Sequence, residues 1–512
     1  MSAVIGIDLG TSNSVVALSE RGRVTIIADN DGNKIHPSAV AFMKDGSVLV
    51  GVKAKSGLAQ RPTQTVVSAK RLIGRRQGSE QVREAQARMG YTIVPVENGV
   101  GVAIESQVHR LETISALILR HLRDLAESFL ATTCDRAVIT VPAYFDDNQR
   151  QATRAAAKMV GIEVMRIVNE PTAAAYAYGY GGNRSHRVAV YDLGGGTFDI
   201  SVLELGEGAL EVLSTGGDTF LGGDDFDAKA ADLLAGQILS LTGRDPRQDP
   251  AARQRLLVMA EAMKCELSSA EHCEQDATAL AGIPMTVSLT RADFEAAIGP
   301  SVDRTITLCE AALTDAGIHV SEVDGVVLVG GSTRIPAVRQ AVTKYFRREP
   351  DQSIDPDLVV GVGAAMYAAQ LGGKSSTNRV LLDVTPRSLR IGTVGGYTES
   401  ILLRNSPIPT ERSRLFSTAR DGQEQVAMRI YQGESEEAAE NVLLGEFLFG
   451  PLPPKPRGEV EIAVTFAIDP DGLVQVTARD LATGVAAAAR INLATRVDAT
   501  KSNDADLPAA KA

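Results

Sequence analysis

Residues 4–16 read VIGIDLGTSNSVV, and residues 188–200 repeat the pattern as VAVYDLGGGTFDI. Each copy predicts a strand, an Asp-Leu-Gly turn and a second strand, because apolar and β-branched runs flank a glycine-rich turn. The two copies lie far apart in the sequence. A duplicated unit of this kind predicts two similar lobes that face each other, each contributing one turn to a shared ligand.

These two turns suit a ligand that carries phosphate groups. Glycine lets the backbone approach a bulky anion closely, and consecutive backbone N–H groups form an anion-binding nest. The hydroxyl groups of Thr11, Ser12 and Thr197 add further donors. A pair of ordinary hairpin turns is the alternative interpretation, and the matching of the two copies disfavours it.

Three aspartates accompany the turns, namely Asp8, Asp192 and Asp199. A carboxylate beside a phosphate requires a cation between them, and Mg²⁺ prefers oxygen ligands and retained waters. The sequence therefore predicts that these aspartates hold Mg²⁺, directly or through water.

A third glycine turn, Gly330-Gly331-Ser332-Thr333-Arg334, follows the apolar strand expected at 326–330. A helix is expected after it, over 335–347, so a ligand can lie at the helix N-terminus. The planar guanidinium of Arg334 can stack on a base. This is not a Walker site, because the chain contains no GxxxxGK[ST] motif.

The chain is expected to divide near residue 375. Before that point short apolar runs alternate with helical patterns, which predicts an α/β layered fold. Helices are expected at 114–130, 148–160, 253–268, 291–316, 335–347 and 357–370, and strands at 4–8, 15–18, 137–141, 188–192, 200–205 and 326–330.

Beyond Pro386 the apolar residues recur with a period of two, as in Val460, Ile462, Val464 and Phe466. About eight such runs, separated by Gly, Pro and Asp turns, predict a β-sandwich. The expected units are a nucleotide-binding domain over 1–375, an apolar linker over 376–386, a β-sandwich over 387–497 and a polar, disordered tail over 498–512.

Composition excludes several classes of protein. The net charge of −11 disfavours nucleic acid as the main partner, because phosphate binding needs a basic face. Four dispersed cysteines without a CxxC pair indicate neither a disulfide framework nor a strong zinc site. Cys265, His272 and Cys273 lie close in sequence, and we interpret them as ordinary structural residues. No secretory signal and no apolar run of about 18 residues is present, so we expect a cytoplasmic protein without a membrane partner.

The three glycine turns, in this order, resemble the phosphate-1, phosphate-2 and adenosine signatures of actin-like ATPases. Further runs narrow the resemblance to the 70-kDa heat-shock (DnaK-type) chaperones, and the resemblance covers residues 2–495. These runs are KRLIGR at 70–75, VITVPAYF at 138–145, NEPTAAA at 169–175, GGDTFLGGDDFD at 216–227, the linker, and FSTA at 416–419. The resemblance implies an actin-like ATPase domain with two duplicated lobes, followed by an all-β peptide-binding sandwich.

The same resemblance implies roles in ATP hydrolysis. Lys70 resembles the family's catalytic lysine, which positions the attacking water at the γ-phosphate. Glu170, Asp199 and Thr197 complete the hydrolytic shell. Phosphoryl transfer to water depends mostly on positioning and charge stabilisation, which such a set of residues supplies.

The implied cofactors are ATP or ADP with Mg²⁺, which Asp8 and Asp192 hold largely through its waters. Glu261, Lys264 and Ser268 share one helix face, and the resemblance places them at the ribose and adenine. A charged, solvated helix face is the alternative. The implied nucleotide-binding residues are Gly10, Thr11, Ser12, Asn13, Gly194, Gly195, Gly196, Thr197, Glu261, Lys264, Ser268, Gly330, Gly331, Ser332, Arg334 and Asp357.

Val380-Leu381-Leu382 is an apolar triplet between polar flanks. A strand of the sandwich is one interpretation. The resemblance instead implies a linker that docks on the ATPase lobe with ATP bound and is released with ADP, assisted by Asp383. It also implies that Pro142 and Arg150 report the nucleotide state to the other domain. A nucleotide would then shift the population between the docked and the released linker, because it binds the two arrangements with different affinity.

The resemblance further implies a peptide groove in the sandwich, where small and branched side chains accept one aliphatic residue of an extended peptide. Periodicity alone would assign all of the implied residues to the core. They are Ile391, Val394, Phe416, Ala419, Val426 and Met428.

The chain departs from the family pattern in several places. It ends soon after residue 495, so the family's helical lid is expected to be absent, with fast client release and weak holding. No acidic C-terminal partner motif is present. The family's Thr-Thr-Pro-Ser turn reads Ile35-His36-Pro37-Ser38, and arginines stand at 387 and 390 in place of the usual Leu and Gly.

We therefore expect a monomeric ATP-hydrolysing chaperone that binds unfolded clients, with a J-domain protein and a nucleotide exchange factor as partners. A nucleotide-gated scaffold that hydrolyses little is one alternative. A small-molecule kinase on the same fold is another, and the sandwich and apolar linker disfavour it.

Overall fold

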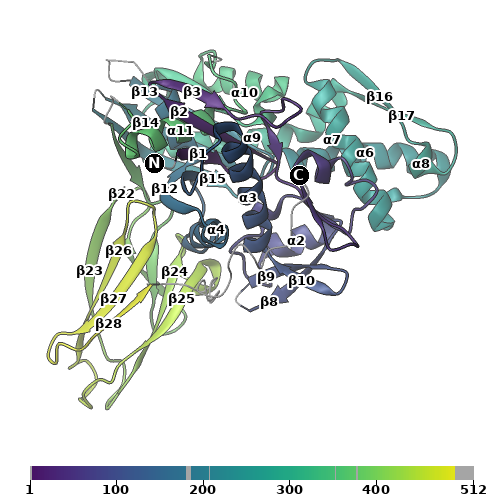
Figure 1. The fold of residues 1–512 in the computed structure, drawn as a ribbon. Helices are drawn as coiled ribbons and strands as arrows, with labels where there is room; N and C mark the ends of the chain where they lie inside the picture. Colours follow the sequence, from purple (N-terminus) through teal and green to yellow (C-terminus); the bar gives the residue numbers. More distant parts are fainter. Residues whose placement is uncertain are drawn as a thin grey trace.

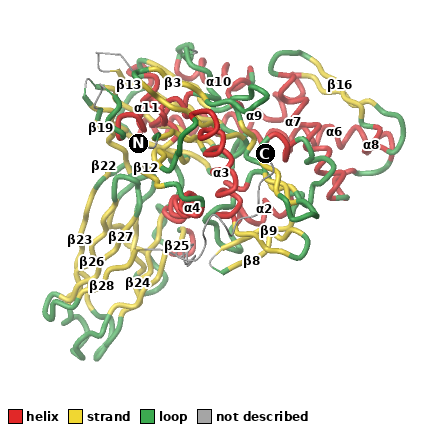
Figure 2. Tube along the Cα trace, in the orientation of Figure 1, coloured by secondary structure: helices red, strands yellow, loops and turns green. Residues whose placement is uncertain are grey.

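A computed structural model describes residues 3–97, 99–179, 186–206, 208–351, 353–375 and 379–490. It shows an α/β body from which a β-sandwich extends (Figure 1). In Figure 2 the helices gather in the α/β body, whereas the sandwich consists of strands and loops. No helix in this described part of the chain has the length and apolar composition needed to cross a bilayer.

Two related sheets form the centre of the α/β body. In each, an antiparallel hairpin is joined by an Asp-Leu-Gly turn, and its first strand pairs in parallel with a later strand. The first sheet contains β1 (Val4–Asp8), β2 (Asn13–Glu20), β3 (Arg23–Ile26), β4 (His36–Pro37), β11 (Arg136–Val141) and β12 (Glu163–Asn169). The second contains β13 (His186–Leu193), β14 (Phe198–Leu205), β15 (Ala209–Asp218), β18 (Gly325–Val329), β19 (Val380–Val384) and β22 (Pro407–Ile408). The duplicated lobes predicted from the repeat are confirmed.

A layer of two helices joins these sheets. Helix α11 (Val359–Leu371) packs on α5 (Glu170–Tyr178) and on β1, and their alanine and valine side chains share one buried cluster with both sheets. A Cβ atom on Gly6 would lie 2.1 Å from the Ala365 nitrogen, and one on Gly363 would lie 1.8 Å from the Ala173 carbonyl oxygen. The packing of α11 on the first sheet and on α5 therefore requires glycine at these two positions.

Other helices cover the outer faces of the sheets. Helices α3 (Leu111–Leu130) and α4 (Asp147–Met159) pack on the first sheet, and α9 (Arg291–Asp315) packs on the second. The remaining α-helices are α1 (Val52–Lys55), α2 (Glu80–Arg88), α6 (Gly223–Thr242), α7 (Pro250–Leu267), α8 (Thr278–Ala281) and α10 (Pro336–Phe346).

Three small sheets complete the α/β body. They are β5–β7 (Val40–Phe42, Val48–Val50, Thr65–Val66), β8–β10 (Thr92–Val96, Gly99–Ile104, Gln107–Arg110) and β16–β17 (His272–Asp276, Thr286–Thr290). The predicted helices and strands before residue 375 all form, with ends that differ by at most three residues.

The C-terminal strands form a sandwich of two four-stranded sheets, as the period of two predicted. One sheet has the order β21 (Thr398–Leu402), β20 (Leu389–Gly392), β24 (Val426–Gln432), β25 (Val442–Phe449). The other has the order β23 (Thr410–Ser417), β26 (Glu461–Ile468), β27 (Val474–Asp480), β28 (Ala486–Arg490). Alternating residues of the inner faces, such as Ile462, Val464 and Phe466, form a separate buried cluster.

The apolar triplet at 380–382 belongs to the α/β body. As strand β19 it pairs in parallel with β15, residue 380 opposite Ala209 and residue 382 opposite Glu211, and Asp383 and Val384 then pair with β22. The interpretation of this triplet as a strand of the sandwich sheets is therefore wrong. The proposed domain boundaries and the expected lack of a lid stay predictions, and the expected polar tail lies outside the described residues.

Phe466 offers a test of the sandwich core, because its side chain is fully buried between the sheets. We expect Phe466→Ala to destabilise the sandwich by about 3–5 kcal/mol through lost burial and an unfilled cavity. Leu448→Ala, at an exposed position of the facing sheet, is the matched control and should change stability by less than about 1 kcal/mol. Differential scanning calorimetry of the full chain should show one transition shifted to lower temperature only in Phe466→Ala, and equal shifts would contradict the assigned core.

Candidate functional site

The predicted glycine turns converge between the two lobes. A cavity there is lined by the turn after β1, the turn after β13 and the glycine turn after β18. Its lining residues include Asp8, Gly10, Thr11, Ser12, Asn13, Glu170, Asp192, Gly194, Gly195, Thr197, Gly330, Gly331 and Asp357. Segments separated by more than 100 residues in the sequence therefore meet at one place, as the repeat implied.

Backbone contacts fix the shape of these turns. The Gly194 amide donates to the Thr197 carbonyl at 3.1 Å, and the amides of Gly223 and Asp224 donate to the carbonyls of Gly194 and Gly195. The Ser332 hydroxyl donates to the Gly194 carbonyl at 2.9 Å and so ties the third turn to the second. The turns are thus ordered by the protein itself and leave glycine backbone facing the cavity.

Buried carboxylates crowd the floor of this cavity. Burial, followed by the charge of Glu170, raises the pKa of Asp8 to about 7 and that of Asp199 to about 8. Burial and the neighbouring carboxylates also raise the pKa of Asp192. The Oδ2 atom of Asp199 is buried without a hydrogen-bond partner. Carboxylates in this state attract a cation, so the residues fit the implied Mg²⁺.

Among the described residues, no three His, Cys, Asp or Glu side chains are arranged to ligate a metal ion together. Mg²⁺ commonly keeps several of its waters and binds one or two carboxylates together with a phosphate. The Cys265, His272 and Cys273 segment is not such a group either. The Cys273 thiol lies instead against the carbonyl oxygens of Met263 and Leu289.

Lys70 is the cation closest to the buried acids. Its Nζ donates to Glu170 Oε1 at 2.5 Å, both side chains are buried, and the Phe145 ring centroid lies 5.5 Å from Nζ. Lys70 stands on a single 3₁₀ turn, Ala69–Arg71, which Ser68 enters with a left-handed φ of 53°. Glu170 begins α5 directly after β12, so two elements of the first lobe hold the pair.

Two charged clusters involve residues that the resemblance implied for the nucleoside. Lys264 forms an ion pair with Asp227 at 2.8 Å, and Arg334 bonds to Asp355 and Asp357. Ser268 is the C-cap residue of helix α7, one turn after Lys264. Arg334 is thereby held in place by two aspartates, of which Asp357 lines the cavity.

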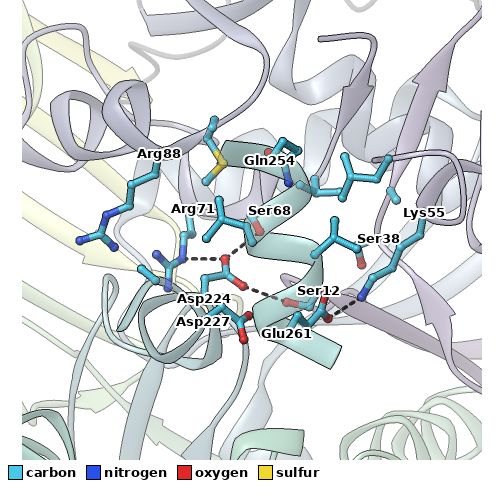
Figure 3. Close-up of a pocket in the computed structure, with 17 residues that line it drawn as sticks. Ser12, Ser38, Lys55, Ser68, Arg71, Arg88, Asp224, Asp227, Gln254 and Glu261 are labelled. Carbon is cyan, nitrogen blue, oxygen red and sulfur yellow. Dashed lines mark hydrogen bonds and ion pairs between the residues drawn. The ribbon is translucent and has the colours of Figure 1, made fainter. Parts of the chain in front are cut away.

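Several residues at the cleft were given no role from the sequence. Figure 3 shows Lys55 of the first lobe paired across the cleft with Glu261 of the second, at 2.6 Å. It also shows Asp224 between Ser68 and Arg71, and the Arg71 side chain is fully buried. Arg71 lies in the run at 70–75 and Asp224 in the run at 216–227. The opposite charges of these two family runs were the sequence signal that could have predicted their contact.

The linker strand connects to this site through side-chain hydrogen bonds. Asp383 Oδ2 accepts bonds from Asn169 Nδ2 at 2.9 Å and Thr172 Oγ1 at 3.0 Å. Arg150, fully buried, donates to Asn169 Oδ1 at 2.6 Å and to the carbonyls of Ala143 and Phe145. Pro142 begins the same turn, accepting the Phe145 amide. A continuous set of bonds thus joins β19 to the turn beside Lys70.

The sandwich also contacts the α/β body directly. Asp471, in the β26–β27 turn, accepts the Ile167 amide at 3.1 Å and pairs with Arg154 at 2.9 Å. The Val474 amide donates to Asp147 Oδ1 at 2.8 Å. Arg404 pairs with Asp315 at 2.7 Å. These contacts hold the sandwich against helix α4 and the first lobe on one side and against helix α9 on the other.

The residues expected around a peptide groove divide by exposure. Ile391 and Met428 are buried in the sandwich core, and Phe416 and Val426 pack against that core while remaining partly exposed. Val394 is 80% exposed and Ala419 is exposed. Two of the six therefore lie mainly in the core, and the other four are accessible to a ligand.

Gly10 allows a test of the first turn. A Cβ atom there would lie 1.9 Å from the Asn13 carbonyl oxygen, so Gly10→Ala must distort the turn. We expect Gly10→Ala to weaken ATP binding by at least about tenfold, since one lost charge-assisted contact is of that order. Gly236→Ala, where an added Cβ meets nothing within 4 Å, is the matched control. Isothermal titration calorimetry would compare them, and unchanged affinity in Gly10→Ala would contradict the assigned cradle.

The chain matches one protein-family model, described as Hsp70 protein, over residues 4–507. That span includes both lobes, the linker strand and the sandwich. Members of this family are ATPases that act as chaperones. With its duplicated turns, its central cavity and a match over nearly its whole length, the chain belongs to the Hsp70 family.

Proposed function

We propose that this protein is an ATP-dependent chaperone that binds extended apolar segments of unfolded proteins and couples ATP hydrolysis to their affinity. The observation that carries the proposal is the linker strand β19, which is paired with β15 and bonded through Asp383 to the buried network beside Lys70. A nucleotide that binds the docked and the released states of this strand with different affinity would change the affinity of the sandwich for its client.

In the proposed reaction the phosphates of ATP lie on the turns at Gly10–Asn13 and Gly194–Thr197. Bound Mg²⁺, near Asp8 and Asp192, would supply charge neutralisation of the phosphates. We assign to the Lys70 ammonium group the positioning of the attacking water, and its ion pair with Glu170 supports this role because it fixes the ammonium beside the buried acids. Asp199, with one oxygen bonded to the Tyr144 amide and the other without a partner, is placed to accept a proton from that water.

The sandwich would bind a client through its accessible apolar side chains. Val394 and Ala419 are exposed, and Phe416 and Val426 lie beside the core. An extended peptide gains sequence-tolerant backbone hydrogen bonds in such a site, and one apolar pocket supplies the preference for aliphatic residues. J-domain and exchange partners, and a cytoplasmic location, form part of the same proposal.

A nucleotide-gated scaffold for a dedicated partner is the second candidate. His36 is the observation that favours it, because this residue replaces the hydroxyl expected from the family turn and stands, buried, two positions before Ser38, whose hydroxyl donates to the Gly10 carbonyl. Such a change beside the phosphate turn would alter hydrolysis while leaving binding in place.

Single-turnover ATP hydrolysis tests the proposal, with and without an apolar extended peptide. We expect slow hydrolysis that peptide accelerates severalfold, and at least about a hundredfold loss in Lys70→Ala, since one removed electrostatic contact commonly has that effect. Lys44→Ala, on an exposed loop, is the matched control. Hydrolysis that peptide does not change, with normal ATP affinity, would favour the scaffold.

Docking of the sandwich should depend on pH. Burial raises the pKa of Asp147 to about 7, and it also raises the pKa of Asp383 and Asp471 at the same contacts. A solvated aspartate titrates near 3.9, so docking takes up protons between about pH 4 and pH 7. Docking is then strongest below that range and weakens as the pH rises through 7.

Small-angle X-ray scattering with a non-hydrolysable ATP analogue would measure this dependence. The radius of gyration should increase between pH 6 and pH 8, and Asp147→Asn should reduce the increase because the amide does not titrate. A radius that stays constant over this range in the native chain would contradict the prediction.

A further inference from the structure

Arg387 makes a contact between the sandwich and the α/β body that involves an aromatic ring. The residue lies between β19 and β20, and its guanidinium carbon is 4.1 Å from the centroid of the Tyr144 ring. Its Nε atom is buried and has no hydrogen-bond partner. The family pattern has leucine at this position, so the contact is a property of this chain.

The surroundings of Arg387 are not those of an ordinary ion pair. The nearby cation Arg75 is buried, and it lies 3.8 Å from Asp146 and donates to Thr219. Burial lowers the pKa of Arg75, and repulsion by the Arg387 cation lowers it further. The Tyr144 ring therefore supplies the favourable contact that keeps the Arg387 cation at this place, as an aromatic face does for a partly desolvated guanidinium.

Tyr144 also touches the hydrolysis centre directly. Its backbone amide donates to Asp199 Oδ1 at 3.0 Å. The next residue, Phe145, holds its ring 5.5 Å from Lys70 Nζ. Ring and amide belong to one residue, so a contact that immobilises the ring also restrains the backbone segment that carries the amide. Arg387 is thus linked to Asp199 through the contacts of one intervening residue, Tyr144.

We propose that Arg387 is a positioning residue for ATP hydrolysis, acting through Tyr144. While the sandwich is docked, Arg387 holds the Tyr144 ring and with it the amide on Asp199. An Asp199 carboxylate that accepts this hydrogen bond is a weaker base towards the attacking water, so hydrolysis is restrained until a client peptide displaces the sandwich. This inference rests on the proposed chaperone function and adds a residue that sets its basal rate.

The first experiment does not depend on hydrolysis. Hydrogen–deuterium exchange of the full chain, with a non-hydrolysable ATP analogue, follows the segment 141–146, which includes the Tyr144 amide. Arg387→Gln should make this segment exchange at least about threefold faster, in keeping with the strength of a cation–π contact. Arg387→Lys, which keeps a cation, should remain close to the native chain.

Arg404→Leu is the matched control, because Arg404 also pairs across the two units but contacts Asp315, away from Tyr144. Its exposed ion pair contributes little, and exchange at 141–146 should stay native. Equal acceleration in Arg404→Leu and Arg387→Gln would mean that Arg387 only holds the units together, and this result would overturn the proposal. Native exchange in Arg387→Gln would overturn it as well.

The second experiment measures single-turnover hydrolysis and ATP affinity. Arg387→Gln should raise the rate without peptide about threefold, reduce the stimulation by peptide, and leave the Kd for ATP unchanged. In a Tyr144→Leu background the same substitution should have no further effect, whereas Arg404→Leu should act equally in both backgrounds. Additive effects of Arg387→Gln and Tyr144→Leu would overturn the proposal.

The two experiments separate the inference from the proposed function. If the native chain does not hydrolyse ATP, the proposed function fails, and the exchange experiment still decides the role of Arg387. If peptide accelerates hydrolysis in the native chain, and Arg387→Gln shows the same basal rate and the same acceleration, only the inference fails.

Discussion

The structure depends on the concentration of negative charge at the centre of the α/β body. Asp8, Asp192, Asp199 and Glu170 are buried or nearly buried together, and Lys70 is the single cation bonded to any of them in the described structure. Like charges in a low-dielectric interior repel strongly, so several of these carboxyls hold protons more tightly than usual. A cation with bound phosphates relieves that repulsion. Ligand binding is therefore favoured by the same groups that destabilise the empty site.

The rest of the fold keeps these acids in place. Each is at the end of a strand or the start of a helix, and the lobes that carry them are joined through α11 and α5. The close approach at Gly6 and Gly363 holds α11 tightly against the first sheet and against α5. The bonded series from Arg150 through Asn169 to Asp383 leads from the site to the linker strand.

The sequence predicted most of this architecture because its signals are local. The spacing of apolar residues and the glycine turns can be recognised within short segments. The strands at 4–8 and 188–192 and the helix near 291–316 could therefore be predicted. The turns at Gly10 and Gly194 could be paired because they repeat. Contacts that depend on the tertiary fold could not be found this way. The pairing of Lys55 with Glu261, and the place of Arg387 on Tyr144, join residues about 200 or more positions apart.

Strand β19 has a consequence for biosynthesis. It completes the second sheet beside β15, yet it lies some 170 residues later in the chain. While the chain is being made, the outer side of β15 is an unpaired edge with free N–H and C=O groups, until residues 380–384 leave the ribosome. Such edges recruit other strands, and long-range pairing is slow to form. The nascent chain of a folding helper would thus itself pass through a stage that is prone to aggregation.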